Sequence, residues 1–438
     1  MSWAEGLAAG VSLLLILLVI GVPIFVAFLI LNVAGVLYLM GPPGFGMLAN
    51  SILSTATISA LTAVPLFIVM GELLFRSGAM EVLLNSLDRL VGRIRGRQYV
   101  LCILLSAIVG ALSGAAMAVA GLLGRSLFPT MVQRGYDRKL SAGTILAGAS
   151  LDPIIPPSVL AILIATIAQI STGKLLIAGL VPGLVLTVMF LAYVGVRLVI
   201  NPALAPDLTA EEVDGKPRSS AFMAFLRMLP SVFIFFLVMG LVMLGVATPT
   251  EAAATGVVGA LVLAAFYRRL SWQMVHASLM SGVTVSSLLL VVMCCAVMFS
   301  QLLTFTGAPQ ALGELVTELK LPGWLMLTMM LALPFVLFMF LDQIAIMLVL
   351  VPIYKPLLVI YSFDEIWFFT LFLIVATVGG ISPPFGYTLF AFKSAAPDMP
   401  MSEVFSASWP FVWLIMAGLV LMAIFPPLIT WLPSIAGP

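Results

Sequence analysis

The sequence predicts an all-α, polytopic membrane protein built from two inverted structural repeats. Its 438 residues are 63% hydrophobic and only 8% charged, and the mean hydropathy is +1.24. Soluble domains carry about 25% charged residues, so most of this surface must face lipid. Two apolar runs are interrupted by Pro156-Pro157 and Pro383-Pro384, which lie 383 − 156 = 227 residues apart. Paired interruptions of two hydrophobic halves are typical of the binding site of a secondary transporter.

Composition also excludes several classes of function. The net charge of +1 leaves no basic surface for nucleic acid. Cys102, Cys294 and Cys295 lack metal-like spacing, and His276 is the only histidine. No nucleophile–base pair or phosphate loop is present, so we expect neither an enzyme nor a bound cofactor. The residues before the first apolar run lack the features of a secretory signal, and we expect that run to be the first membrane helix.

The apolar runs predict roughly a dozen membrane segments, because one helical span needs about 20 residues. Several runs are too long for one span or are broken by Gly and Pro, so some segments should enter and return from the same side. The runs cover residues 8–40, 46–75, 98–132, 140–170, 172–201, 227–247, 250–267, 274–305, 321–358, 365–396 and 404–433.

Short motifs recur between the two halves at nearly constant spacing, which predicts the internal repeat. The matched positions are Gly78 with Gly307, Pro129 with Pro352, Asp137 with Asp364, and Pro182 with Pro410. Their offsets lie within a few residues of 227. The resulting division is scaffold helices at 1–75, repeat one at 76–201, a polar connector at 202–226, scaffold helices at 227–305, and repeat two at 306–438.

Charge predicts that the two repeats are inverted. The first connection of repeat one is rich in arginine, at Arg76, Arg89, Arg93, Arg95 and Arg97. The equivalent connection of repeat two carries Glu314 and Glu318 and only one lysine, Lys320. Because positive charge marks the cytoplasmic side, the two connections should lie on opposite sides of the membrane.

The interruptions themselves predict binding chemistry. Proline has no N–H, so each break should release carbonyl oxygens four residues earlier, at Ala149, Asp152, Pro153, Gly379 and Gly380. Such oxygens at membrane depth suit Na⁺. The half-helices that follow begin near Ser158 and Gly386, and their N-termini suit a carboxylate. An ordinary proline kink is the alternative for a single Pro-Pro, and the symmetric pair argues against it.

A second irregular element precedes each break. Ser113 and Gly114 predict the tip of a re-entrant hairpin in the first half, where small-residue helix packing is the alternative. Asp342 lies at the matched place and could favour a cation, cap a hairpin helix, or do both. Asp152 could likewise add charge to a cation site or cap the following half-helix.

Three other features have structural interpretations. Thr248-Pro249-Thr250-Glu251 predicts a helix start with a capping box. Arg125 should lie near an interface, and Lys393 should lie at a helix end rather than face an anionic substrate.

Taken together, these motifs resemble the large, DctM-like membrane subunit of tripartite ATP-independent periplasmic (TRAP) transporters. The resemblance covers essentially the whole chain. It is carried by Ser113-Gly114-Ala115, Arg134-Gly135-Tyr136-Asp137, Ile154-Ile155-Pro156-Pro157-Ser158, Thr248-Pro249-Thr250-Glu251, Asp342 and Ser382-Pro383-Pro384-Phe385-Gly386. It implies an elevator-type carrier in the bacterial cytoplasmic (inner) membrane, driven by Na⁺. It also implies a small four-helix (DctQ-like) membrane subunit and a periplasmic binding protein as partners, and most often an organic acid as substrate.

The resemblance also implies two sodium sites. The first would involve Ser113 and Gly114 with Ile155 and Pro156, and the second Asp342 with Gly380, Ser382 and Pro383. Substrate would lie between the tips, near Ser113, Ala115, Ser158, Ser382 and Gly386.

This chain departs from the family pattern at three positions. Ala115 stands where many relatives have serine, Val119 where some have aspartate, and Asp152 where glycine is usual. Asp152 could compensate for the lost hydroxyl or could couple a proton.

We therefore expect a sodium-driven, binding-protein-dependent importer of a small carboxylate. Three alternatives remain open at this point. The first is a stand-alone sodium- or proton-coupled dicarboxylate or anion carrier without a binding protein, the second is a channel, and the third is a membrane scaffold or enzyme.

Overall fold

A computed structural model describes residues 3–91, 94–113, 116–206 and 221–436, and every regular element in these ranges is a helix. The first part of the chain forms α1 (Trp3–Val19), α2 (Ile24–Leu39), η1 (Pro42–Gly44), α3 (Phe45–Ala56), η2 (Ser59–Thr62), α4 (Ala63–Arg76), α5 (Ala79–Leu90), α6 (Arg97–Ser113), α7 (Ala116–Ser126), α8 (Phe128–Gln133), α9 (Arg138–Ser150), α10 (Val159–Ala168), α11 (Thr172–Ala178), α12 (Leu180–Ile200) and η3 (Pro202–Leu204).

The second part continues the all-helical fold. Its elements are α14 (Ala221–Met243), α15 (Pro249–Phe266), α16 (Trp272–Phe305), α17 (Ala308–Leu319), α18 (Gly323–Phe338), α19 (Gln343–Ile360), α20 (Glu365–Ile381), α21 (Tyr387–Ala395), α22 (Met401–Ile424) and α23 (Pro427–Ile435). The predicted polar connector 202–226 falls mostly outside the described residues, and its last residues, from 221 onward, already belong to α14.

By length and composition, seven helical segments of the described chain could cross a membrane. Six further apolar helices are shorter, at 10 to 17 residues, and two of these, Val159–Ala168 and Glu365–Ile381, adjoin the Pro-Pro interruptions. The 10 residues of Val159–Ala168 extend only about 15 Å at 1.5 Å per residue, about half of the hydrocarbon core, whereas the 17 residues of Glu365–Ile381 extend about 25 Å. The helix that follows the first interruption therefore cannot cross the membrane alone.

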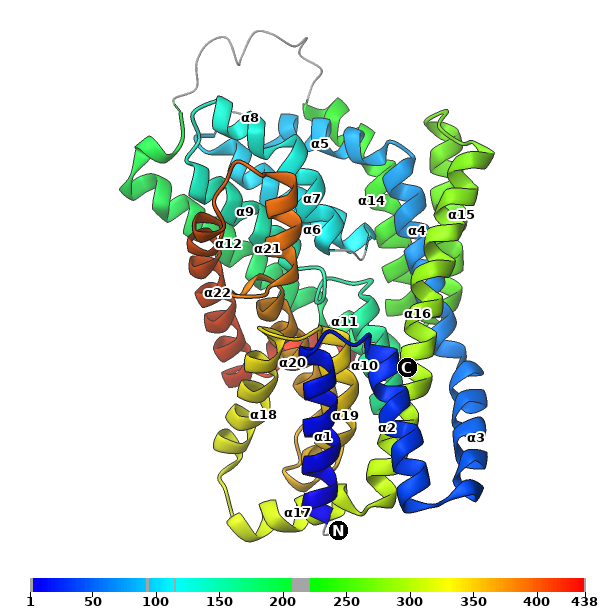
Figure 1. Cartoon of the computed structure of the whole chain (residues 1–438). Coiled ribbons are helices and arrows are strands. Elements are labelled where there is room, and N and C mark those ends of the chain that lie inside the picture. The colour runs from blue at the N-terminus through cyan, green and yellow to red at the C-terminus, as the bar shows by residue number, and fades with distance from the viewer. Residues whose placement is uncertain (1–2, 92–93, 114–115, 207–220, 437–438) are drawn as a thin grey trace.

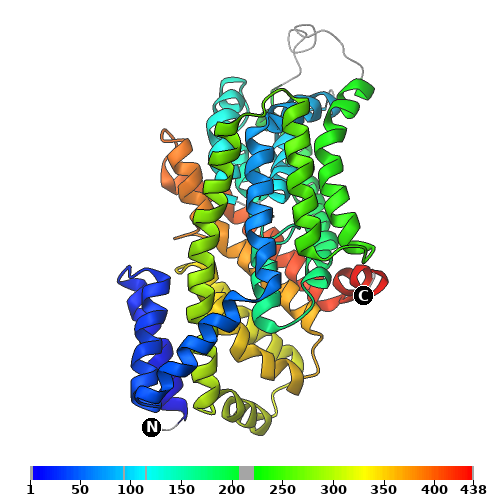
Figure 2. The same ribbon diagram turned by 90° about the vertical axis from the view of Figure 1, so that its right-hand side faces the viewer.

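The helices are arranged in two groups beside a set of long helices (Figure 1). α5, α6 and α7 lie toward the top of the view, whereas α17, α18 and α19 lie toward the bottom. Figure 2 shows α16 running along most of the molecule beside α4, and α15 packs against α4 as well. The arginine-rich and glutamate-containing connections therefore lie at opposite ends of the molecule. The inverted orientation of the two repeats stays a prediction.

Local features recur at the predicted spacing. Asp137 caps α9 by accepting a hydrogen bond from the Leu140 amide at 2.7 Å, and Asp364 caps α20 by accepting one from the Trp367 amide at 2.7 Å. These caps lie 364 − 137 = 227 residues apart. Gly78 and Gly307 precede α5 and α17 with left-handed φ angles of 82° and 72°. The recurrences support two repeats, and the division into scaffold and repeats stays a prediction.

The predicted helix start at Thr248 is confirmed. The Thr248 hydroxyl accepts from the Glu251 amide at 3.3 Å, and the Glu251 carboxylate accepts from the Thr248 amide at 2.8 Å. This reciprocal pair is a capping box, and Pro249 occupies the first helical position. Its role is to begin α15.

Candidate functional site

The first interruption leaves the chain non-helical between α9 and α10. Residues 151–158 form turns and bends, in which the Ile154 and Ile155 amides donate to the Leu151 carbonyl at 3.1 and 2.9 Å. Ser158 precedes α10, and its hydroxyl accepts from the Ala161 amide at 3.2 Å while donating to the Pro153 carbonyl at 2.7 Å. The Ser158 hydroxyl, which was expected to contact substrate, is therefore engaged twice within its own segment.

The second interruption separates α20 from α21. The Ser382 hydroxyl donates to the Val378 carbonyl at 2.8 Å, and the Thr388 hydroxyl donates to the Gly380 carbonyl. Gly386 packs so tightly that an added Cβ would lie 2.7 Å from the Gly380 oxygen. Gly386 also lacks any side chain that could cap α21. The N-terminus of α21 thus has no side-chain cap, unlike that of α10.

Two of the carbonyls that the prolines were expected to release are partly occupied. Pro153 accepts from Ser158, and Gly380 accepts from Thr388. A carbonyl oxygen has two lone pairs, so each can still accept a second interaction. Pro156 and Pro383 lie inside the two non-helical segments, and both Pro-Pro peptide bonds are cis.

An aspartate lies at the N-terminus of α19 and another at the N-terminus of α7. Asp342 caps α19 through Oδ1, which accepts from the Ile344 and Ala345 amides at 2.8 and 3.2 Å. Asp152 lies in the first interruption, and its Oδ2 accepts from the amide of Ala116, the first residue of α7, at 3.3 Å. The capping role considered for Asp342 is present, whereas Asp152 caps α7 rather than the half-helix α10.

Part of the predicted first tip cannot be placed. Gly114 and Ala115 lie outside the described residues, as does the side chain of Ser113. The α6 helix ends at Ser113, α7 begins at Ala116, and the two helices contact each other.

The structure adds two polar residues, Gln343 and Tyr387, to which the sequence analysis gave no role in the site. Gln343 follows Asp342, is buried, and donates from Nε2 to the Ala376 carbonyl of α20. Tyr387 opens α21, and its phenol lies beside Gly380, where an added Cβ would be 3.1 Å from the hydroxyl oxygen. A side-chain amide and a phenol therefore lie beside the last turns of α20. A polar residue in an apolar run is a site hypothesis by default, and that signal could have found Gln343.

Helices of the two halves also pack across one another. α10 contacts α19 and α21 contacts α7, so the helix that follows each interruption lies against a helix of the other half. Lys393, at the end of α21, donates to the Pro397 and Met399 carbonyls at 2.6 and 2.9 Å, and Arg125 is exposed near the end of α7. Lys393 thus lies at a helix end, as expected.

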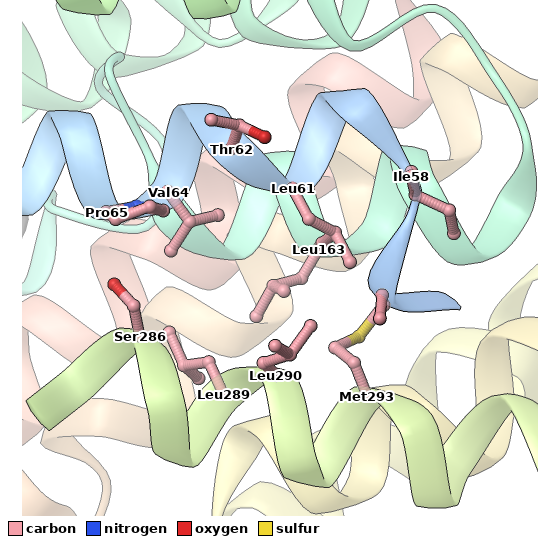
Figure 3. A pocket seen from close by; sticks show the side chains of 11 residues that line it. Ile58, Leu61, Thr62, Val64, Pro65, Leu163, Ser286, Leu289, Leu290 and Met293 are labelled. Atoms are coloured by element: carbon pink, nitrogen blue, oxygen red, sulfur yellow. The ribbon is translucent and has the colours of Figure 1, made fainter. Parts of the chain in front are cut away.

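A separate cavity of about 190 Å³ lies between α10, the η2–α4 region and α16 (Figure 3). Leu163 of α10 faces Leu289, Leu290 and Met293 of α16 across it. The side-chain oxygens in its lining belong to Thr62 and Ser286. Such a lining cannot compensate the charge of a carboxylate, so this cavity marks a contact between helices rather than the substrate site.

The described part of the chain contains no group of three or more His, Cys, Asp or Glu residues that could hold a metal ion.

Comparison with known proteins agrees with this architecture. The chain is 29% identical over 402 residues to the C4-dicarboxylate TRAP transporter large permease protein DctM of Pseudomonas aeruginosa, covering 91% of this chain and 92% of that one. It is 26% identical over 426 residues to the ectoine TRAP transporter large permease protein TeaC of Halomonas elongata, covering 96% and 97%. Its fold is similar to that of MtrF of Neisseria gonorrhoeae, with a TM-score of 0.66, 14% identity and coverage of 95% and 94%.

The structural likeness shows an all-helical, multi-pass membrane fold and nothing more. A fold by itself does not determine a function. The family is shown by sequence. The family model for the tripartite ATP-independent periplasmic transporter DctM component matches residues 11–428. Members of this family are permeases of the inner membrane and not enzymes. The chain belongs to the DctM component family of tripartite ATP-independent periplasmic transporters.

Proposed function

We propose that this chain is the large permease subunit of a sodium-driven importer of a small organic acid, fed by a periplasmic binding protein. The single observation that carries the proposal is the crossed packing around two non-helical interruptions, one from each half. The helix after each interruption contacts a helix of the other half, α10 with α19 and α21 with α7, and Asp152 and Asp342 lie at the N-termini of α7 and α19. Buried irregular backbone at membrane depth is tolerated where it lines a site.

The cation sites would use the oxygen atoms around each interruption. The first would combine Ser113, Gly114 and Asp152 with the backbone of Ile155 and Pro156. The second would combine Asp342 with Gly380, Ser382 and Pro383. Support comes from the remaining lone pairs of these carbonyls and from two aspartates that have no lysine or arginine partner among the described ion pairs. Unwound carbonyls of this kind coordinate Na⁺ in other secondary transporters.

The substrate would lie between the two hairpin tips. Ser113, Ala115, Ser158, Ser382 and Gly386 are the residues proposed to surround it. The N-terminus of α21 is the favoured carboxylate contact, because Gly386 offers no side-chain cap whereas Ser158 already caps α10. The dicarboxylate transporter of Pseudomonas aeruginosa supports a carboxylate substrate.

We propose an elevator motion for the transport step. Hairpins and interrupted helices would move together against the scaffold helices, with α10 sliding along α16 at the apolar cavity (Figure 3). The crossed packing of α10 with α19 and of α21 with α7 supports a single moving unit. Apolar contacts favour sliding, because no hydrogen bond has to break.

The family implies two partners, a small four-helix membrane subunit and a soluble binding protein. The driving force suffices, since each elementary charge that crosses the membrane contributes about 2.3 kcal/mol per 100 mV. Two Na⁺ ions would therefore more than offset the inward movement of one monovalent carboxylate.

Uptake in proteoliposomes tests the proposal. The liposomes would hold this chain with its small subunit, and a C4-dicarboxylate would be supplied with the binding protein, with and without an inward sodium gradient. We expect saturable uptake that requires both. Equal uptake without sodium would contradict the coupling, and equal uptake by the chain alone would establish the stand-alone carrier. Conductance without saturation would instead indicate a channel.

A further inference from the structure

The two halves place their tip carboxylates at different positions of the chain. At the 227-residue spacing, Asp342 corresponds to Ala115, since 342 − 115 = 227, and Asp152 corresponds to Gly379, since 379 − 152 = 227. Each half thus has one aspartate and one small residue at this pair of positions. In the first half the aspartate belongs to the interruption, and in the second half it belongs to the hairpin.

Both carboxylates nevertheless serve the same element, the N-terminus of the second hairpin helix. Asp342 Oδ1 accepts from Ile344 and Ala345 at the start of α19, and Asp152 Oδ2 accepts from Ala116 at the start of α7. The first amides of a helix have no partner within it, and negative charge stabilises that end. Alanine at position 115 has a methyl side chain and cannot accept these hydrogen bonds.

The room for a side chain at positions 152 and 379 agrees with an aspartate at the first and a glycine at the second. Gly110 of α6 lies against Asp152, and an added Cβ on Gly110 would be 3.7 Å from Asp152 Cβ, which is ordinary contact. In the second half a Cβ on Gly379 would lie 2.3 Å from Phe338 Cβ. Position 379, in the last turn of α20, therefore has no room for a side chain, whereas position 152 in the first interruption accommodates one.

We propose that Asp152 is a positioning residue that caps α7 from the first interruption, in place of the cap that Ala115 cannot provide. The bond fixes the start of α7 to the non-helical segment 151–158 through Asp152, which is 36 positions from Ala116 in the chain. Asp342 by contrast caps its own helix and moves with it. The inference rests on the proposed function only in taking this junction to be part of the transport site. Asp152 Oδ1 is buried without a partner among the described residues and remains available for a cation.

Relocating the carboxylate tests the proposal. The variants are Asp152→Gly, Ala115→Asp and the double variant, which copies the arrangement of the second half. We expect Asp152→Gly to lower uptake about five- to thirtyfold, the population change that loss of a helix cap produces. The double variant should recover uptake to within about threefold of the wild type, because the cap is restored from position 115.

Asp364→Ala is the matched control. Asp364 caps the N-terminus of α20, where its Oδ1 accepts from the Trp367 amide at 2.7 Å. The interruption follows the other end of this helix, so the variant removes a cap of the same kind far from the site. It should lower thermal stability without changing the sodium and substrate concentrations that give half-maximal uptake. Asp152→Gly should change these concentrations, because it alters the site.

Two outcomes would overturn the proposal. One is a double variant that melts like the wild type but remains as defective as Asp152→Gly. The other is Asp152→Asn, which keeps an acceptor oxygen for the Ala116 amide, losing uptake completely even at saturating sodium while its melting temperature is unchanged. The Asn variant also decides the question if Asp152→Gly does not fold. Sodium dependence of the wild type tests the proposed function separately from all of these variants.

Discussion

Lys355 of α19 donates a hydrogen bond from its ammonium group to the carbonyl oxygen of Ala168, the last residue of α10. The next residue, Gln169, is left-handed with φ of 55°, so the helix ends there. A cation at a helix C-terminus meets the negative end of the helix dipole and its unpaired carbonyls. The bond thus joins α19 to α10, the helix that follows the first interruption.

Lys355→Met should therefore destabilise the packing of α10 on α19. We expect a loss of about 1.5–3 kcal/mol, the range for a hydrogen bond to a charged group. Thermal unfolding of the purified protein in detergent measures it. Lys320→Met is the control, because Lys320 is exposed at the end of α17. Equal melting of the two variants would show that the Lys355 bond contributes nothing.

Gly379→Ala should be destabilising for a steric reason. The new Cβ would lie 2.3 Å from the Cβ of Phe338, and such overpacking costs about 1–3 kcal/mol. Gly240→Ala in α14 adds the same methyl group where nothing lies within 4 Å, and it should be neutral or stabilise the helix by up to about 1 kcal/mol. A Gly379→Ala protein as stable as the wild type would disprove the close contact between α18 and α20.

Asp342→Asn should weaken sodium activation of uptake. The amide oxygen can still accept from the Ile344 and Ala345 amides, so the cap is kept while the negative charge is removed. We expect the half-saturating sodium concentration to rise about tenfold, equivalent to about 1.4 kcal/mol of binding. Asp364→Asn, which makes the same change in a cap outside the site, is the control. Unaltered sodium activation would remove Asp342 from the cation site.

Joining α10 to α16 should stop transport if these helices slide past each other. Leu163 and Leu290 line the same cavity, so cysteines at both positions can be cross-linked with a bifunctional thiol reagent (Figure 3). Cys102, Cys294 and Cys295 would first be replaced by serine. We expect uptake to fall to background after cross-linking and to return on reduction with a cleavable reagent. Full uptake by the cross-linked protein would contradict movement between these two helices.

The sequence was informative where the relevant physics is local. A capping box spans four residues, so Thr248 and Glu251 predict it directly, and the structure confirms it. Proline acts on its own helix, and the chain is non-helical after Ser150 and after Ile381, as the two Pro-Pro pairs indicate.

Contacts between distant segments could not be predicted in the same way. The partner of Asp152 is 36 residues away and that of Lys355 is 187 residues away. Thr388 hydrogen-bonds a carbonyl that proline should release, and only the path of the chain between α20 and α21 brings them together. The sequence therefore predicted where the interruptions lie. The hydrogen bonds that their carbonyl oxygens accept, and the contacts between helices of the two halves, could be seen only in the folded structure.

The exchange of carboxylate between hairpin and interruption has a consequence for the evolution of the family. If the start of the hairpin helix needs one acceptor, substitutions at the positions of Ala115 and Asp152 are not independent. Loss of a side-chain oxygen at the first should be accompanied by gain of one at the second, and an acidic residue at both should be rare because the like charges repel. At the positions of Asp342 and Gly379 no such covariation should occur, because Phe338 leaves no space for a side chain at position 379.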